Sequence, residues 1–412
     1  KADSKGYWEV NLKALETGGP YQLQIIGKEN PISIKDILIG DVWLCSGQSN
    51  MQWVVNNVTN AEVEKKNANY PQIRTLNIPR RMELSPKDTI SATWLVCSPE
   101  NVGRFSGVAY FFAKKVYEET NIPIGIINSS WGGTIVETWT SLEAANTLPQ
   151  KRLDRYNKNE KLFPPTEYLT RKNKEAKRND YPSLVYNAMI HPLLSFSIKG
   201  VLWYQGENNV GNAEPYTDWL TCMIGDWRNR WNSELPFYII QLPNFDSINK
   251  KPLWAEMRDA QSKVLAVPGT HLIVTSDLGD PYDLHPRNKQ EVGMRAALQA
   301  LHYEYGYSDI VSESPMFERM EINGDKVIIT FKNTGSGLEI RSRYGCLQGF
   351  AIAGEDKKFH WALGELKDNR IVIWSPKVPN PVAVRYNWEN NPDGNLYNKD
   401  GLPACLFRTD NW

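Results

Sequence analysis

The most constraining feature of this sequence is an alternation of short apolar segments with longer helical ones between residues 41 and 305. Alternation at this length predicts a parallel sheet covered by helices on both faces, because each parallel connection needs a crossover. We therefore predict an α/β fold, a three-layer α/β/α sandwich. The predicted strands are residues 42–45, 73–78, 124–128, 200–204, 237–242 and 272–275, and the predicted helices are residues 106–119, 216–232, 254–267 and 288–304.

Both ends of the chain have strand patterns instead. Alternating segments with turn signals between them are found at residues 7–12, 21–26, 32–37, 326–331, 350–353, 370–374 and 383–388, with a turn expected at residues 18–20. Three N-terminal strands are too few for an independent sheet. We therefore expect residues 1–40 to complete an all-β domain formed by residues 311–412, with residues 41–310 forming the α/β domain. Residues 150–180, rich in Lys, Arg, Asn and Glu, predict a solvated insertion.

The charge balance argues against several classes of partner. The 412 residues contain 47 Lys and Arg against 47 Asp and Glu, so no basic field is present to bind nucleic acid or an anionic membrane. The longest apolar stretches, such as residues 108–113, are too short to span a bilayer. The cysteines are scattered without a CxxC pair, and no Cys/His cluster has zinc-ligand spacing, so we expect neither a metal nor a cofactor.

A candidate nucleophile follows the first strand of the α/β region, in the motif Gly47-Gln48-Ser49-Asn50. A strand that ends in Gly-x-Ser can present a hydroxyl at the edge of the sheet, where an esterase places its nucleophile. The motif is not the Gly-x-Ser-x-Gly elbow of α/β-hydrolases. The alternative is a strand-terminating turn in which Ser49 caps a helix.

A serine nucleophile needs a base, and Asp283-Leu284-His285-Pro286 offers one. A carboxylate two residues before His285 can bind the imidazole and fix its tautomer, which leaves the other nitrogen for Ser49. Asp277 and Asp280 are alternative orienting groups. The competing interpretation is a surface turn marked by residues 279–281.

Two further segments are candidates for oxyanion stabilisation. Ser130-Trp131-Gly132-Gly133-Thr134 follows one predicted strand, and its glycines let backbone N–H groups approach a substrate closely. Gln205-Gly206-Glu207-Asn208-Asn209 is an amide-rich turn after another strand, in which Glu207 is alternatively a general acid. Ligands of parallel sheets bind beyond the carboxyl ends of the strands, so these segments are expected to meet at one edge. Each segment taken alone is also explained as a simple turn.

Together these motifs resemble the SGNH hydrolase superfamily, and within it the sialate O-acetylesterases. The strings at residues 40–46, 288–293 and 406–410 support the same branch, and the similarity extends over nearly the whole chain. The resemblance implies an SGNH-type, flavodoxin-like sandwich that removes acetyl groups from carbohydrate hydroxyls. It also implies action outside the cytoplasm, in the periplasm or after secretion.

The resemblance further implies roles for individual residues. Ser49 is the nucleophile, His285 the base and Asp283 its partner, while backbone N–H groups of Ser49 and of Gly132 or Gly133 line the oxyanion hole. Many superfamily members place Asp three residues before His, where this chain has Tyr282. The superfamily's third block is Gly-x-Asn-Asp, which leaves the side-chain donor here open among Gln205, Asn208 and Asn209.

The leading functional hypothesis is a carbohydrate esterase that removes O-acetyl groups from sialic acid or a related glycan through an acyl-enzyme. One alternative keeps this mechanism and takes acetylated xylan or another glycan. The arginines that are candidates for binding a sialic acid carboxylate are Arg104, Arg258, Arg287 and Arg295. An alternative of another class is a glycan-binding protein without turnover, because the chain has 15 Trp and 19 Tyr whose rings can stack on sugars or fill the core.

Overall fold

The computed structural model describes residues 3, 4, 6, 8, 10, 12, 13, 15–27, 30–153, 157, 165–170, 181–246 and 251–412. Most of the predicted insertion at residues 150–180 lies outside these residues. So do three of the six residues of the strand predicted at residues 7–12, and the other three are not in a strand.

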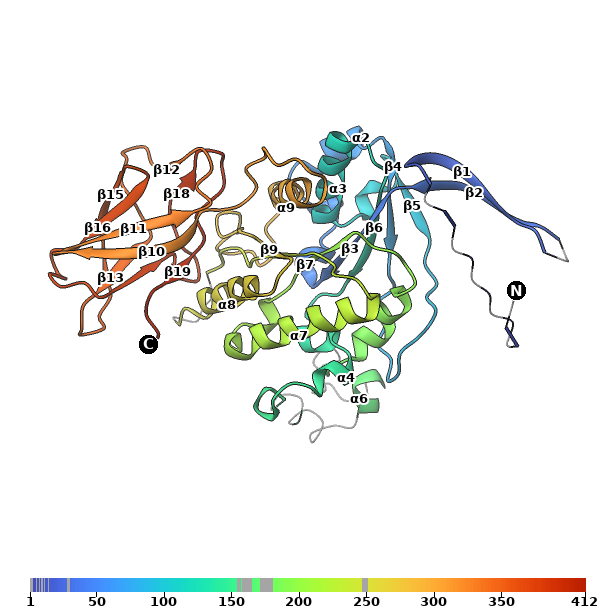
Figure 1. Ribbon diagram of the computed structural model, residues 1–412, viewed down its shortest axis with the longest axis horizontal. Helices are drawn as coiled ribbons and strands as arrows, with labels where there is room; N and C mark the ends of the chain where they lie inside the picture. The colour runs from blue at the N-terminus through green and yellow to red at the C-terminus, as the bar shows by residue number, and fades with distance from the viewer. Residues whose placement is uncertain are drawn as a thin grey trace.

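A seven-stranded sheet forms the centre of the molecule, with the order β5-β4-β6-β3-β7-β8-β9 (Figure 1). Its strands are β3 (Asp41–Gly47), β4 (Tyr70–Asn77), β5 (Trp94–Cys97), β6 (Ile124–Ser130), β7 (Gly200–Tyr204), β8 (Phe237–Ile240) and β9 (Thr270–Ile273). All neighbours are parallel except β4 and β5. The predicted α/β class is confirmed, together with six of the seven strands. The edge strand β5 was not predicted.

Helices cover both faces of this sheet. The long helices are α3 (Gly107–Thr120), α7 (Ala213–Trp231), α8 (Leu253–Ser262) and α9 (Lys289–Glu304), and the short ones are α1 (Ser49–Gln52), α2 (Ala61–Asn67), α4 (Leu142–Ala145) and α6 (Pro165–Thr170). Successive residues of a strand point to opposite faces, so Leu44 packs in the core under α7 and α8, while Cys45 packs under α3 and α9. The predicted three-layer arrangement is confirmed.

The packing of α3 against α9 depends on a glycine. A Cβ atom on Gly293 would lie 2.7 Å from both Phe111 Cβ and the carbonyl oxygen of Val108. The absence of a side chain therefore lets the two helix backbones approach closely, which fixes the position of the first turn of α9 relative to the sheet.

After α9 the chain forms antiparallel sheets. The strands are β10 (Met316–Asn323), β11 (Lys326–Lys332), β12 (Leu338–Ile340), β13 (Phe350–Ala353), β14 (His360–Trp361), β15 (Leu363–Lys367), β16 (Arg370–Trp374), β17 (Ala383–Tyr386), β18 (Leu396–Asn398) and β19 (Phe407–Arg408). They are ordered β10-β11-β16-β15, β14-β13-β17-β19 and β12-β18. A separate apolar core, including Ile329, Ile371 and Tyr386, lies among them.

The N-terminal strands β1 (Gly18–Ile25) and β2 (Ile32–Ile39) pair with each other. Figure 1 places this hairpin at the end of the molecule opposite the C-terminal sheets. The expectation that residues 1–40 complete the C-terminal β domain is therefore wrong for these strands. Gly40 alone separates β2 from β3, so the hairpin stays at the amino edge of the central sheet. Gly18-Gly19-Pro20 also lies inside β1 and does not form the expected turn.

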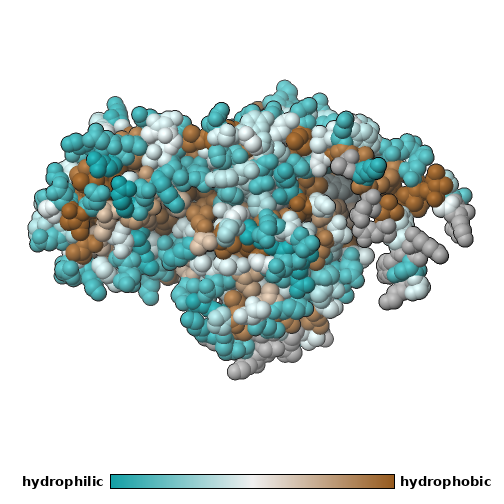
Figure 2. All heavy atoms as spheres, viewed as in Figure 1, coloured by the Kyte–Doolittle hydropathy of each residue, from teal (hydrophilic) through white to brown (hydrophobic). Residues whose placement is uncertain are grey.

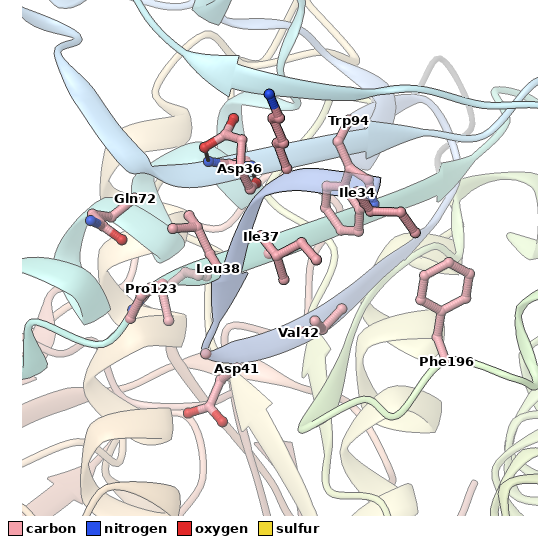
Figure 3. A pocket seen from close by; sticks show the side chains of 15 residues that line it. Ile34, Asp36, Ile37, Leu38, Asp41, Val42, Gln72, Trp94, Pro123 and Phe196 are labelled. Carbon is pink, nitrogen blue, oxygen red and sulfur yellow. Dashed lines mark hydrogen bonds and ion pairs between the residues drawn. The ribbon is translucent and has the colours of Figure 1, made fainter. Parts of the chain in front are cut away.

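The hairpin covers a cavity of about 430 Å³ at the amino ends of the strands (Figure 3). Ile34, Ile37 and Val42 line its apolar part, and the Arg74 guanidinium lies 2.7 Å from the Asp36 carboxylate beside it. The outer side of the hairpin is apolar as well, with Ile26 and Ile32 exposed (Figure 2). This cavity lies at the opposite edge of the sheet from Ser49.

Candidate active site

Three of the motifs meet where adjacent strands β6, β3 and β7 end. Gly47 is in register with Ser130 on one side and Tyr204 on the other. Beyond the strands, the Gln48 N–H donates to the Tyr204 carbonyl at 2.9 Å, and the Trp131 N–H donates to the Gly47 carbonyl at 2.9 Å. The carboxyl edge of the sheet thus brings these segments together, as the strand pattern predicted.

Ser49 is the first residue of α1 and is partly buried. The turn before it requires glycine, because Gly47 has φ +132° and a Cβ there would lie 2.1 Å from the Tyr204 carbonyl oxygen. Gln48 occupies the N-cap position, and no side chain caps this helix. The alternative in which Ser49 serves as a helix cap is therefore wrong, and its hydroxyl is not committed to that role.

His285 lies beside the helix that carries Ser49. Its imidazole stacks on the indole of Trp53, with ring centroids 4.8 Å apart and planes 9° from parallel. Asn50, the residue after Ser49, donates from Nδ2 to the Leu284 carbonyl at 3.1 Å. Among the residues that the structure describes, the buried His285 Nε2 atom has no hydrogen-bond partner. This nitrogen is therefore available to a further group in the site.

The three acidic residues near His285 have different partners. The Asp277 carboxylate forms two 2.7 Å contacts with the Arg295 guanidinium and accepts a 3.2 Å hydrogen bond from the Tyr397 hydroxyl. Tyr397 belongs to β18, so this contact joins the histidine loop to the C-terminal β domain. Asp280 Oδ1 accepts from the Tyr282 N–H at 2.8 Å.

Asp283 is bound to the backbone of His285. Its Oδ1 accepts from the backbone N–H of His285 at 2.8 Å, so its recorded hydrogen bond is to the main chain and not to the ring. Burial lowers the pKa of His285, and the nearby charge of Lys289 lowers it further, while the charge of Asp283 raises it. The balance favours the neutral imidazole, which is the form that accepts a proton.

Gly132 lies against Ser49. A Cβ atom on Gly132 would be 3.2 Å from Ser49 Cβ, and the Gly132 N–H donates to the side-chain oxygen Oε1 of Gln52 at 2.9 Å. The side-chain oxygen of Gln52 thus occupies the position beside Ser49 to which the Gly132 N–H donates. Asn208 is exposed nearby, and its Nδ2 donates to the Gly133 carbonyl at 2.8 Å.

The geometry contradicts the prediction that Gln205 donates to an oxyanion. Its side chain is fully buried, and its Nε2 donates to the Thr134 carbonyl at 3.0 Å and to Asn209 Oδ1 at 2.8 Å. Both N–H bonds are therefore used inside the protein. Asn209 is also buried, and its Nδ2 donates to Glu137. Asn208 is left as the amide side chain of this turn that faces solvent.

Sequence reasoning missed a buried polar group next to these residues. Lys289 Nζ donates to Asn50 Oδ1 at 2.5 Å, and Asn50 Nδ2 donates to Glu207 Oε1 at 2.5 Å. Lys289 follows His285 by only four residues. Because His285 lies in a loop and Lys289 is the first residue of α9, no helical or strand spacing in the sequence links the two.

Within the described part of the chain, no group of three or more His, Cys, Asp and Glu side chains could hold a metal ion. None of the helices described there is long and apolar enough to cross a membrane. The five cysteines are free thiols.

Comparison with known proteins gives consistent results. The family model described as "Carbohydrate esterase, sialic acid-specific acetylesterase" matches residues 39–302. Human sialate O-acetylesterase is 32% identical over 360 residues, which cover 78% of this chain and 65% of the human protein. The mouse sialate O-acetylesterase is 31% identical over 435 residues, covering 93% of this chain and 80% of the mouse protein. The chain therefore spans about two thirds of the length of its human relative.

A solved structure is similar over the whole chain. The crystal structure of a carbohydrate acetylesterase from Xanthomonas citri is 39% identical, with a TM-score of 0.90. The match covers 100% of this chain and 90% of that protein. Both the α/β domain and the C-terminal sheets are therefore shared with it.

Proposed function

The chain belongs to the sialic acid-specific acetylesterase family of carbohydrate esterases, and on that basis we propose that it hydrolyses O-acetyl esters of carbohydrates through a serine acyl-enzyme. The observation that carries this proposal is the buried Nε2 of His285, which has no hydrogen-bond partner among the described residues while the ring stacks on Trp53 beside the Ser49 helix. A nucleophilic hydroxyl requires such a base within reach.

In the proposed reaction, His285 Nε2 accepts the Ser49 proton while Ser49 Oγ attacks the acetyl carbonyl carbon. The tetrahedral oxyanion is bound by the backbone N–H groups of Ser49 and Gly132, with the Asn208 amide at the rim. The substrate carbonyl oxygen takes the place that Gln52 Oε1 occupies beside Gly132. The sugar oxygen then leaves with the proton from His285, and an acetyl-Ser49 ester remains.

Deacylation repeats the same chemistry with water. His285 removes a proton from a water molecule, which attacks the acetyl-Ser49 carbonyl, and the collapse of the second tetrahedral intermediate returns the proton to Ser49 and releases acetate. Asp283 supports both steps, because its negative charge stabilises the imidazolium that forms each time. The predicted domain boundaries and the location outside the cytoplasm stay predictions.

We propose acetylated sialic acid as a substrate on the basis of the relatives' names and of the exposed arginines near the site. Arg295 is bound to Asp277, and Arg258 is fully buried and donates to backbone carbonyls of Glu389 and Asn390, so neither faces a ligand. Arg104 and Arg287 are exposed. Arg287 follows His285 by two residues and is the better placed of the two for the sialic acid carboxylate.

Replacing Arg287 with Gln is expected to raise the KM for acetylated sialic acid by roughly two- to fivefold, the range for an exposed ion pair. The KM for p-nitrophenyl acetate, which has no carboxylate, should not change. Initial rates of acetate release from both substrates give the two KM values, and acetylated xylan is assayed in parallel. Hydrolysis of acetylated xylan with no release from acetylated sialic acid would assign the substrate to the neutral glycans.

Labelling with a fluorophosphonate separates the esterase from a glycan-binding protein. We expect Ser49 Oγ to displace fluoride and form a stable phosphonyl ester, because His285 activates the hydroxyl. Mass spectrometry of the peptide that contains Ser49 should show the adduct, and Ser49→Ala should remain unlabelled. An unlabelled wild-type protein would favour glycan binding without turnover.

A further inference from the structure

A fully buried lysine lies beneath the proposed catalytic residues. Lys289 is 0% exposed, donates from Nζ to Asn50 Oδ1 at 2.5 Å and lies with Nζ 5.4 Å from the centre of the Tyr204 ring. Lysine is almost never fully buried unless it is paired, because removing an ammonium group from water is costly. Its burial therefore depends on the polar groups that surround its amine, beginning with Asn50.

Asn50 connects this lysine to each part of the site. Its Oδ1 accepts from Lys289, and its Nδ2 donates to Glu207 Oε1 at 2.5 Å and to the Leu284 carbonyl at 3.1 Å. One amide thus joins the helix of Ser49, the turn of Glu207 and the loop of His285. The second oxygen of Glu207, Oε2, is buried and has no partner among the described residues.

We propose that Lys289 is a positioning residue for the esterase reaction: it orients Asn50, which fixes the histidine loop against the Ser49 helix, and it places a positive charge near that loop. This inference rests on the proposed function. Lys289 acts through Asn50 and His285, and the reaction scheme does not require it to touch the substrate.

The charges around Lys289 are consistent with this role. Burial lowers its pKa to about 7, while the charges of Glu207 and Asp283 raise it. Helix α3 packs against the lysine stem with uncharged Gly107, where a Cβ would be 3.2 Å from Lys289 Cβ. The positive charge of Lys289 in turn lowers the pKa of His285, against the opposing charge of Asp283. Burial raises the pKa of Glu207, and the nearby charge of Lys289 is among the effects that lower it.

The test compares Lys289→Met with Lys289→Gln in the full chain. Both remove the charge, so both should raise the pKa of His285 and move the acidic limb of kcat/KM upward by about one pH unit. Activity requires neutral His285 and is lost as pH falls through its pKa, so the deficit should be about tenfold at the acidic end and small at alkaline pH. Lys289→Gln keeps a donor for Asn50 and should retain a higher limiting kcat than Lys289→Met.

Lys114→Met is the matched control, because Lys114 is a partly buried lysine of α3 whose Nζ lies 3.2 Å from Glu64 and not from Asn50. Its pH profile should superimpose on that of the wild type. Superimposable profiles for Lys289→Gln and wild type would overturn the proposal and leave Lys289 a structural residue. If neither variant folds, NMR of the imidazoles in the wild type decides: His285 should titrate below the ordinary value of about 6.5, and titration of His285 at or above about 6.5 would overturn the proposal.

The proposed esterase reaction and the proposed role of Lys289 can be refuted separately. An active Ser49→Ala variant would refute the proposed function whatever Lys289 does. An inactive Ser49→Ala variant together with an unshifted profile for Lys289→Gln would refute only the role of the lysine.

Discussion

Replacing Ser49 with Ala is expected to lower the release of acetate from acetylated sialic acid and from p-nitrophenyl acetate by roughly 10⁴- to 10⁶-fold. The substitution removes the only atom that forms the proposed acetyl ester, while Gly132 and Asn208 keep their positions for binding the substrate. Because Ser49 is the first residue of α1 and does not cap it, the change should leave the melting temperature nearly unchanged. Steady-state kinetics and thermal unfolding monitored by circular dichroism measure the two effects.

Ser46→Ala is a suitable control, since Ser46 is a buried serine on β3, three residues earlier, whose hydroxyl has no partner in the described structure. We expect near-normal kcat/KM for it. Turnover by Ser49→Ala at the wild-type rate would exclude the acyl-enzyme scheme.

His285→Gln should cause a loss of similar size, roughly 10³- to 10⁶-fold in kcat, because glutamine fits the space but cannot accept a proton at neutral pH. In the wild type, burial and the Lys289 charge lower the pKa of His285. The acidic limb of kcat/KM should therefore lie below the ordinary histidine pKa of about 6.5, and the enzyme should stay active in mild acid.

His191→Gln provides the comparison for this variant. His191 is a partly buried histidine whose Nδ1 lies 3.0 Å from the Lys87 carbonyl, and we expect it to retain wild-type kinetics. An acidic limb that persists unchanged in His285→Gln would assign the titrating base to another residue.

The sequence predicted the central sheet well because each buried strand has a short apolar run, as β7 shows with all five residues buried. It was less informative where the structure depends on distant partners. Residues 21–26 and 32–37 had correct strand patterns, but alternation does not identify the partner of a strand, and β1 and β2 pair with each other.

In the candidate site too, local patterns were informative and contacts between distant residues were not. Gly132 was identified because glycine lets a backbone N–H group approach a substrate closely. The three amides Gln205, Asn208 and Asn209 look alike in the sequence, and only their neighbours show that Gln205 donates both N–H groups internally. The contact of Lys289 with Asn50 spans 239 residues, and no local pattern reports such a pairing.

The contact between Tyr397 and Asp277 has a practical consequence for anyone who shortens this protein. Tyr397 holds the carboxylate that begins the histidine loop, and the Arg341 guanidinium lies 4.2 Å from the centre of the Tyr397 ring. A shortened protein that is meant to keep the proposed base in place should therefore extend through β18, because this hydrogen bond crosses from the C-terminal sheets to the histidine loop. We therefore expect removal of the C-terminal sheets to loosen the loop that carries the imidazole.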